Sequence, residues 1–388
     1  MMEDAGGAIE QPSEGGDQMK RAISLAGGGP AAGLHIGALK KLAEANINFD
    51  VWALSCIGAW VGIVYHQFDG NEVEKADQTY EAFKLIFRDD ASYRMFPVNT
   101  VFPPSPISNT LSTIEFFCNP DNYRDLVVPH AIVEALTDTY DFLSNPERWN
   151  EGDFNGWLFR GLSVNPIMRL FTAMLWKAGR NGLTALYQPE GGFLRSLNFD
   201  RLYRDDRPFI YHNAWNLTKS RIEQFANKPR AGYNRLDART LCACSALPFI
   251  EETIVIGEDT FCEGALVHTM NFERLLEDHP DLDEVWIVRI VDRSQVRPPK
   301  ALHQSLENAY MLFAASLGQA NVELFRYHAR DLGWRGRIIE LPVSPKVNFD
   351  WNHGNLDLGV SEGYAAATAV LAKSPFQNFI RGYRAFVA

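Results

Sequence analysis

Two short apolar runs near the start of the chain are each followed by a tight turn and a helical pattern of apolar residues. The first run, residues 21–26, ends in a glycine triplet, and apolar residues then recur at helical spacing over residues 34–43. The second run, residues 50–54, leads through a short turn into an apolar helical segment, residues 58–65. Each run therefore predicts a strand, a turn and a helix.

Strand and helix patterns alternate again toward the end of the chain. Strands are expected over residues 207–215, 284–291 and 337–341, and helices over residues 302–327 and 362–373. This alternation is typical of a mainly parallel sheet with helices on both faces. The sequence therefore predicts an α/β fold, a three-layer α/β/α sandwich around a mainly parallel central sheet.

A long segment, about residues 92–205, interrupts this alternation and is dense in Phe, Trp, Tyr, Pro and Asn. We expect a mostly helical insertion there, either a subdomain with its own core or an apolar cover over the site. Residues 1–20 are rich in Gly, Glu, Asp and Gln, which predicts a disordered arm. One α/β domain is then expected over residues 21–295, with residues 296–388 completing the same domain.

Composition and charge narrow the class of protein. The 388 residues are 46% hydrophobic and 22% charged, which is enough for a sizeable core. The net charge of −11 argues against a nucleic-acid partner and against strong attraction to anionic lipid. We expect neither a secretory signal nor a membrane span. The five cysteines follow no disulfide or zinc spacing, so we expect a cytoplasmic protein without a metal site.

The glycine triplet after the first run is the first candidate site. Gly27, Gly28 and Gly29 expose backbone N–H groups next to the start of a predicted helix. The partial positive charge of a helix N-terminus favours a negative ligand atom. A phosphate oxygen and a developing oxyanion both fit this description.

The second turn, Leu54-Ser55-Cys56-Ile57-Gly58, has the position of a nucleophile elbow. An elbow normally reads G-x-S-x-G and holds its nucleophile on a strained strand-to-helix turn above the sheet. Cys56 stands in the nucleophile position. Ser55 could take that position only with a small residue where Ile57 stands, so we favour Cys56.

These two motifs resemble the patatin-like phospholipase family, which pairs a G-G-G-x-R-G oxyanion loop with a G-x-S-x-G elbow. The family's third motif, D-G-[GA], resembles Glu263-Gly264-Ala265, which follows a helix-like stretch of small residues within residues 241–250. The resemblance covers roughly residues 20–295. It implies the patatin-like fold and a hydrolase of lipid-type carboxylic esters in lipid degradation. It also implies an apolar ester substrate, transient contact with a lipid surface, and no cofactor.

The resemblance further implies which residues carry the reaction. Cys56 stands in the place of the family's serine and would attack the ester carbonyl to form an acyl-thioester. Glu263 stands in the place of the family's aspartate and would assist Cys56. Backbone N–H groups of the two turns would form the oxyanion hole. The residues implied for oxyanion and substrate binding are Gly27, Gly28, Gly29 and Ile57.

Several positions depart from the family's pattern, and one of them is Leu54 in place of the elbow's first glycine. Besides Cys56 and Glu263, Ala31 replaces the arginine that follows the family's glycine triplet. A helix N-terminus lowers the pKa of a thiol, whereas a neighbouring carboxylate raises it, so the two effects on Cys56 oppose each other. His35 and His268 are the histidines nearest to the motifs in sequence and are candidates for an auxiliary base.

Two other functions stay open at this point. The first is a catalytically inactive member of the same fold that binds a lipid or a protein partner. The second is a dinucleotide-binding oxidoreductase, because residues 27–32 also fit G-x-G-x-x-A between a strand and a helix. That fingerprint needs an acidic residue at the end of the second strand, whereas Asp50 precedes that strand.

Overall fold

The computed structural model describes residues 19–95, 106–124, 126–177, 182–185, 187, 192–300 and 302–373. Almost all of the expected disordered arm, and parts of the expected insertion, lie outside these ranges. The chain divides into two compact units. The main unit comprises Met1–Val101, Gln188–Ser245 and Ile254–Ala388, and the helical unit comprises Phe102–Tyr187 and Ala246–Thr253. The domain bounds expected from the sequence stay a prediction.

The strands of the main unit are β1 (Arg21–Leu25), β2 (Val51–Leu54), β4 (Phe209–Asn216), β5 (Arg221–Ala226), β6 (Tyr233–Arg235), β8 (Ile254–Ile256), β9 (Asp259–Glu263), β10 (Glu284–Val288) and β11 (Arg337–Leu341). Its helices are α1 (Ala32–Glu44), α2 (Ile57–Tyr65), α3 (Glu72–Ile86), α4 (Asp90–Met95), α9 (Gly192–Ser196), α10 (Ala238–Cys244), α11 (Leu275–Asp278), α12 (Leu302–Asp331) and α13 (His353–Lys373). Short 3-10 helices are η3 (Phe199–Tyr203), η4 (Gly264–Leu266) and η5 (Arg293–Gln295).

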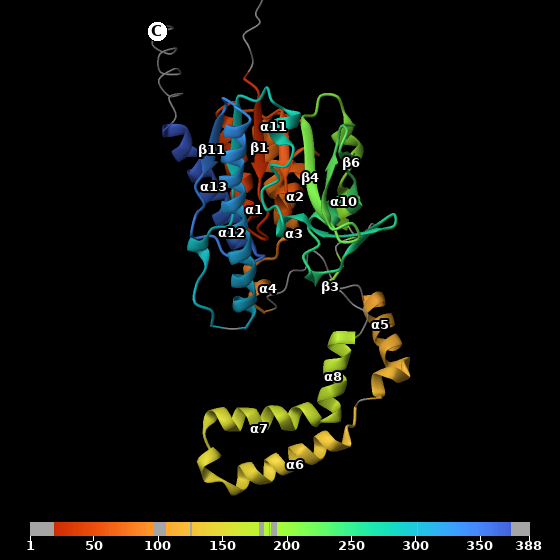
Figure 1. The fold of residues 1–388 in the computed structure, drawn as a ribbon. Helices are drawn as coiled ribbons and strands as arrows, with labels where there is room; N and C mark the ends of the chain where they lie inside the picture. The colour runs from red at the N-terminus through yellow and green to blue at the C-terminus, as the bar shows by residue number, and fades with distance from the viewer. Residues whose placement is uncertain are drawn as a thin grey trace, which may run out of the picture. The chain divides into compact units, whose positions relative to one another are not determined.

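Seven strands of a nine-stranded sheet follow the order β11-β10-β1-β2-β4-β5-β6 in the main unit, and β9, which pairs with β4, carries β8 beside it (Figure 1). The strands from β11 to β4 are parallel to one another, whereas β5 and β9 pair antiparallel with β4. Of these parallel strands, β1, β2, β4 and β10 are almost entirely buried, as expected for strands covered on both faces. The predicted α/β fold with a mainly parallel central sheet is confirmed.

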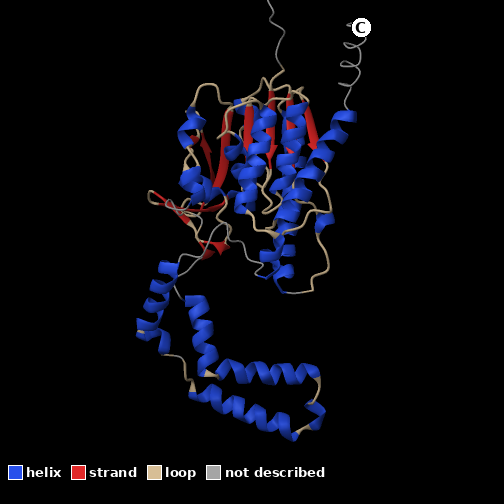
Figure 2. Ribbon diagram, turned by 180° about the vertical axis from the view of Figure 1, so that it is seen from behind, coloured by secondary structure: helices blue, strands red, loops and turns tan. Residues whose placement is uncertain are grey.

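Helices cover both faces of this sheet, and Figure 2 shows the strands in red among the blue helices. On one face, Ala22, Tyr211 and Val285 share a core with Phe325 of α12. On the other face, α2 lies so close to Leu25 and Leu54 that only glycine fits at two positions of the helix. This close contact sets the distance between α2 and the sheet.

Helices α1 and α13 approach each other through glycines. A Cβ at Gly37 of α1 would collide with the carbonyl oxygen of Val360, and one at Gly363 of α13 would collide with that of Leu34. Because α1 begins shortly after the glycine triplet, the close packing of α1 on α13 also fixes where the glycine loop ends.

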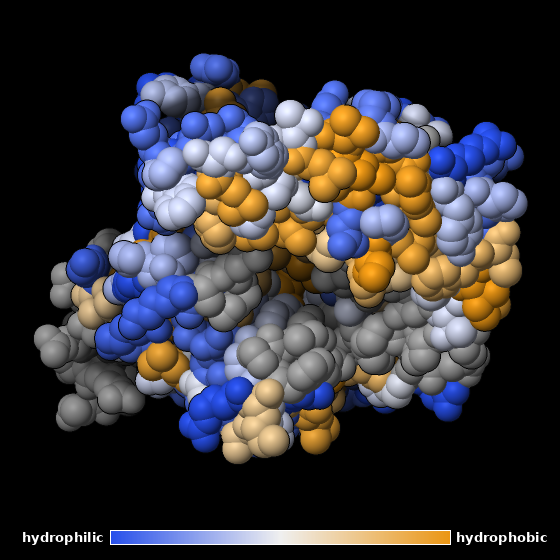
Figure 3. Space-filling model, turned by 90° about the horizontal axis from the view of Figure 1, so that it is seen from below, coloured by the Kyte–Doolittle hydropathy of each residue, from blue (hydrophilic) through white to orange (hydrophobic). Residues whose placement is uncertain are grey.

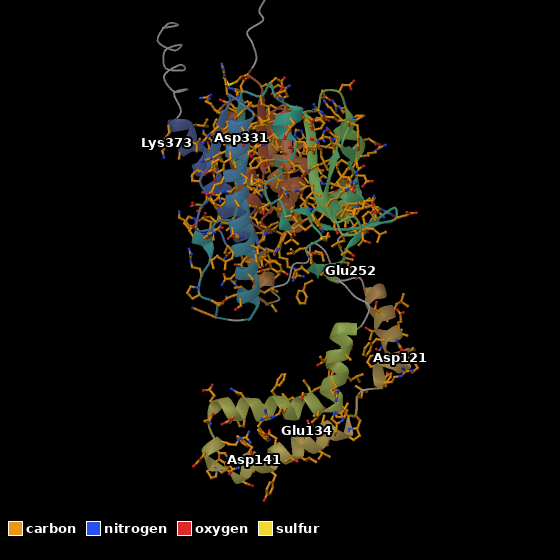
Figure 4. All side chains as sticks on the ribbon, viewed as in Figure 1. Asp121, Glu134, Asp141, Glu252, Asp331 and Lys373 are labelled. Atoms are coloured by element: carbon orange, nitrogen blue, oxygen red, sulfur yellow. The ribbon has the colours of Figure 1, made fainter. Side chains whose placement is uncertain are left out.

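The helical unit contains α5 (Pro106–Cys118), α6 (Pro129–Ser144), α7 (Glu151–Val164) and α8 (Pro166–Lys177), the 3-10 helices η1 (Pro120–Tyr123) and η2 (Pro146–Arg148), and a parallel pair of strands, β3 (Gly182–Thr184) and β7 (Phe249–Glu251). Phe142 of α6 stacks on Trp157 of α7, with ring centroids 5.0 Å apart. Figure 4 labels Glu134 and Asp141, two acidic residues of α6.

One side of α6 carries exposed apolar residues at helical spacing: Val133, Leu136, Tyr140 and Leu143. Figure 3 shows hydrophobic side chains, in orange, gathered into patches on the face of the molecule seen from below.

No helix within the described ranges is both long enough and apolar enough to cross a bilayer.

We expect Gly37→Ala to lower the free energy of unfolding by about 1–3 kcal/mol, because the added methyl group forces α1 away from α13. The control is Gly318→Ala in the middle of α12, where the added Cβ would meet Arg289 at an ordinary 3.5 Å. This control should be neutral or stabilising by up to about 1 kcal/mol, since alanine favours helix. Denaturant unfolding of both variants measures the difference, and equal effects would contradict the close packing.

Candidate active site

The turn after β2 has the geometry of a strained elbow. Cys56 is the residue that precedes α2, and it has φ 47° and ψ −124°, a backbone conformation that is costly for any residue except glycine. The N–H of Ser55 donates to the carbonyl oxygen of Leu25 at 3.1 Å. A Cβ at Gly58 would collide with the same carbonyl, so this glycine lets α2 begin against β1.

Behind the elbow, Ser55 is part of a buried polar network. Its hydroxyl donates to Oδ1 of Asn213 at 2.9 Å, and Nδ2 of Asn213 donates to the carbonyl oxygen of His268 at 3.0 Å. Ser55 and Asn213 have no exposed surface. The hydroxyl of Ser55 therefore contributes to holding the turn, and Cys56 is the residue at its tip.

Strand order explains why Glu263 lies beside Cys56. β2 pairs with β4 only as far as Leu54 opposite His212. Beyond that point β9 pairs with β4 in place of β2, and Glu263, the last residue of β9, lies opposite Ala214. Gly264, the next residue, packs tightly against Asn213, since a Cβ on Gly264 would lie 2.8 Å from Oδ1 of Asn213. The two motifs, far apart in the sequence, are thus brought together at one edge of the sheet.

Cys56 and Glu263 form a buried pair, with 8% and 6% of their surfaces exposed, and a Cβ at Gly27 would lie 3.0 Å from Cβ of Cys56 and 3.9 Å from Oε1 of Glu263. Burial raises the pKa of Glu263 from about 4.3 for a free glutamate to about 7, although the hydrogen bond from the thiol opposes this shift. Burial, and then the charge of Glu263, raise the pKa of the Cys56 thiol well above its usual range, and the N–H of Ile57 opposes them only weakly. The thiol therefore keeps its proton at neutral pH, with an acceptor next to it.

The glycine loop lies over this pair. The N–H of Gly27 donates to the carbonyl oxygen of Thr269 at 3.0 Å, so it is used within the fold. A Cβ at Gly27 would lie 3.0 Å from Cβ of Cys56 and 2.7 Å from that of Ala265. Gly29 has φ 64°, which favours glycine. Within the described residues, no partner is seen for the N–H groups of Gly28 and Gly29, which leaves both able to bind an oxyanion.

The two candidate histidines have other contacts. His35 is fully buried, and its Nε2 lies 2.9 Å from the carbonyl oxygen of Ala26, so Nε2–H is the donor. Burial lowers the pKa of His35 to about 4, which keeps it neutral. At His268 the carbonyl oxygen, which accepts from Asn213, contributes to the site's framework. These contacts give both residues a structural role beside the site, and a role as auxiliary base stays a prediction.

Three residues near the pair were not expected from the sequence. The N–H of Cys56 donates to Sγ of Cys244 at 3.0 Å, and Cys244 is fully buried at the end of α10. Asn213 is the centre of the network behind the elbow. Tyr310 of α12 lies close enough to Glu263 for the carboxylate to help raise the pKa of its phenol, after partial burial. Of these three residues, only Cys244 had a signal in the sequence, which was its Cys-x-Cys spacing from Cys242. That spacing does not show what Cys244 contacts.

The geometry of the site also indicates how well a dinucleotide or a metal ion would fit there. Asp50 lies before β2, at the amino edge of the sheet, and its carboxylate accepts the N–H of Arg21 at 2.9 Å. The glycine loop follows β1 and is at the opposite edge, so Asp50 does not face a ligand on that loop. In the part of the chain that the structure describes, no group of three or more His, Cys, Asp or Glu side chains is placed to hold a metal ion.

Comparison with known proteins gives a family model and similar solved structures. A family model described as patatin-like phospholipase matches residues 23–276, more than half of the chain. The fold is similar to the crystal structure of VipD from Legionella pneumophila, with a TM-score of 0.38 and 13% sequence identity. That likeness covers 91% of this chain and 66% of the VipD chain, just under two thirds of its length. No curated protein matches the chain.

We expect Glu263→Gln to speed alkylation of Cys56 by iodoacetamide at pH 7 by about tenfold, the effect of one pKa unit. Glutamine removes the negative charge that raises the pKa of the thiol, so the thiolate fraction grows. Mass spectrometry measures the rate, and exposed Cys118 is the internal reference. Unchanged labelling of Cys56 would show that Glu263 does not control its ionisation, and slower labelling would show that the loss of Glu263 as a base outweighs the loss of its charge.

Proposed function

Because the chain belongs to the patatin-like phospholipase family, we propose that it is an acyl hydrolase that cleaves lipid-type carboxylic esters through Cys56 and Glu263. Members of this family are typically lipid acyl hydrolases. The observation that carries the proposal is a buried thiol next to a buried carboxyl at the tip of a strained turn. A cysteine packed only for its volume would need neither the strain nor the carboxyl.

In the proposed reaction, Sγ of Cys56 attacks the ester carbonyl while its proton moves to the carboxylate of Glu263. The N–H groups of Gly28, Gly29 and Ile57 hold the oxyanion of the tetrahedral intermediate. Glu263 returns the proton to the departing alkoxide, which leaves as an alcohol and an acyl-thioester on Cys56. Water, deprotonated by Glu263, then attacks the thioester, and the carboxylic acid leaves as the thiol is restored.

The protonation states of the pair suit this sequence. A carboxylate with its usual pKa is a poor base for a thiol, but burial brings the pKa of Glu263 to about 7. Glutamate also has one methylene more than aspartate, which helps it reach a sulfur atom that lies farther from the backbone than a serine oxygen. The two departures from the family's pattern thus compensate each other in length.

Apolar surroundings of the glycine loop support a lipid-type substrate. Ile290 and Val291 lie against Gly28, and the ring of Phe349 lies against Gly29. An ester with an apolar acyl chain gains from such walls, whereas a strongly polar ester does not. Transient contact with a lipid surface and a cytoplasmic location belong to the same proposal and remain to be tested.

The first test uses p-nitrophenyl esters of increasing chain length. Cys56→Ala should lose at least about a hundredfold in kcat/KM, as expected when a nucleophile is removed. Cys118→Ala, which removes an exposed cysteine, should leave the rate unchanged. The double variant Cys56→Ser with Glu263→Asp restores the family's residues and should hydrolyse the esters faster than Cys56→Ser alone. Equal turnover by wild type and Cys56→Ala would rule out Cys56 as the nucleophile.

The second test is the pH dependence of kcat/KM. Only the carboxylate form of Glu263 can accept the thiol proton, and its raised pKa means that this form is lost as pH falls below about 7. We therefore expect a rate that is half-maximal near pH 7 and falls tenfold per pH unit below it. A carboxylate with the usual pKa would keep the rate level down to about pH 5. A level profile would therefore contradict the role of Glu263.

An inactive lipid- or partner-binding protein is the second candidate function. The raised pKa of the Cys56 thiol favours it, because a protonated, buried thiol is a weak nucleophile without help from its partner. Binding of phosphatidylcholine vesicles by wild type, with no turnover of any ester in the series and none in the double variant, would support this alternative.

A further inference from the structure

A second cavity lies at the other edge of the sheet from Cys56. Its volume is about 470 Å³, within the usual range for a small-molecule site. It opens where β2 begins at Val51 and β4 begins at Phe209. His66, which follows the last residue of α2, lines it together with the first turn of α3. The proposed ester site does not include any of these residues.

Aromatic rings form part of the wall. Trp52 and Tyr65 both line the cavity, and their ring centroids lie 5.3 Å apart. Trp52 also meets the imidazole of His66 edge to face at 4.5 Å. Phe49 and Phe209 extend the same wall. A flat or short apolar body could therefore lie against this side of the cavity.

The cavity also contains buried polar groups with unused hydrogen-bonding capacity. His66 is only 2% exposed, and neither of its ring nitrogens has a partner among the described residues. Arg207 is only 5% exposed; its Nη2 donates to Asp69 at 2.7 Å, but its Nε has no partner in the same part of the chain. Buried polar groups left without partners are rare, because each destabilises the fold.

The cations near His66 indicate which kind of group the cavity lacks. The charges of Lys75 and Arg207 add to burial in lowering the pKa of His66, so both lie close to its ring. Lys20 and Lys228 bring the cations lining the cavity to four, against three carboxylates.

The three carboxylates already have partners. Asp50 accepts the N–H of Arg21, Glu72 pairs with Lys75, and Asp206 pairs with Arg204. What the cavity lacks is therefore an acceptor that can reach the N–H groups of Arg207 and His66.

We propose that this cavity binds a small organic oxyanion, a carboxylate or phosphate carried on a short apolar body. The oxyanion accepts hydrogen bonds from Nε of Arg207 and from the N–H of neutral His66, and the body lies against Trp52 and Tyr65. Lys75 and Lys228 add long-range attraction. The site is separate from the ester site, so the two proposals stand or fall independently.

The test is a titration of the whole chain with benzoate, acetate and inorganic phosphate. The ionic strength is held constant, and chloride is the reference anion. We expect saturable binding in calorimetry and a change in tryptophan fluorescence that Trp52→Phe removes. Benzoate should bind at least tenfold more tightly than acetate, because only benzoate has a ring to place against the aromatic wall. Phosphate binding as tight as that of benzoate would identify a plain phosphate site and overturn the role of that wall.

Two variants and one control separate the site from general charge effects. Arg207→Met and His66→Phe should each weaken benzoate binding at least tenfold, by removing the donors. Lys219→Met removes one positive charge from an exposed residue paired with Asp259, and binding should be unchanged. Circular dichroism checks that each variant is folded; if one is not, the other carries the test. Equal affinity in all four proteins, or no saturable binding in wild type, would overturn the proposal.

Discussion

The pairing of Cys56 with Glu263 depends on where two strands end. β2 stops at Leu54 while β4 continues to Asn216, and the free edge of β4 is then occupied by β9. The turn after β2 and the end of β9 must therefore meet at the same point. Asn213, on the part of β4 between the two pairings, ties the elbow to the next loop through Ser55 and the His268 carbonyl. Strand length thus determines the position of both side chains.

This constraint also explains the protonation of the pair. Groups held at the junction of three strands and two helices lose most of their contact with water, and burial disfavours the charged form of each. The thiol keeps its proton, and the pKa of Glu263 moves toward that of a useful base. In water a carboxylate could not take a proton from a thiol efficiently. Burial makes the Glu263 carboxylate a stronger base, while the raised pKa of the Cys56 thiol opposes its ionisation.

Local sequence predicted the parts of the site that depend on local structure. β1, β2 and the turns after them follow from apolar runs, glycines and helical spacing, and β11 has the expected bounds, Arg337–Leu341. α13 begins at His353, well before the expected residue 362, because Gly354 and Gly359 weaken the helical pattern while contact with α1 stabilises the helix. Cys244 and Asn213 could not be found from spacing, since their contacts join strands and helices far apart in the sequence.

Helix α2 joins the two edges of the sheet. Its residues, Ile57–Tyr65, are all buried, with Cys56 before the first turn and His66 after the last. The N-terminal end of a helix attracts an oxyanion, whereas the C-terminal end repels one by about half a charge. At the cavity near His66, Lys75 and Arg207 offset part of that repulsion, although each is paired with a carboxylate. The carboxylates paired with them, Glu72 and Asp69, are themselves partly exposed and so screened by water. The same buried helix therefore lies between two anion-compatible sites for opposite reasons, its own backbone at one end and side chains from neighbouring elements at the other.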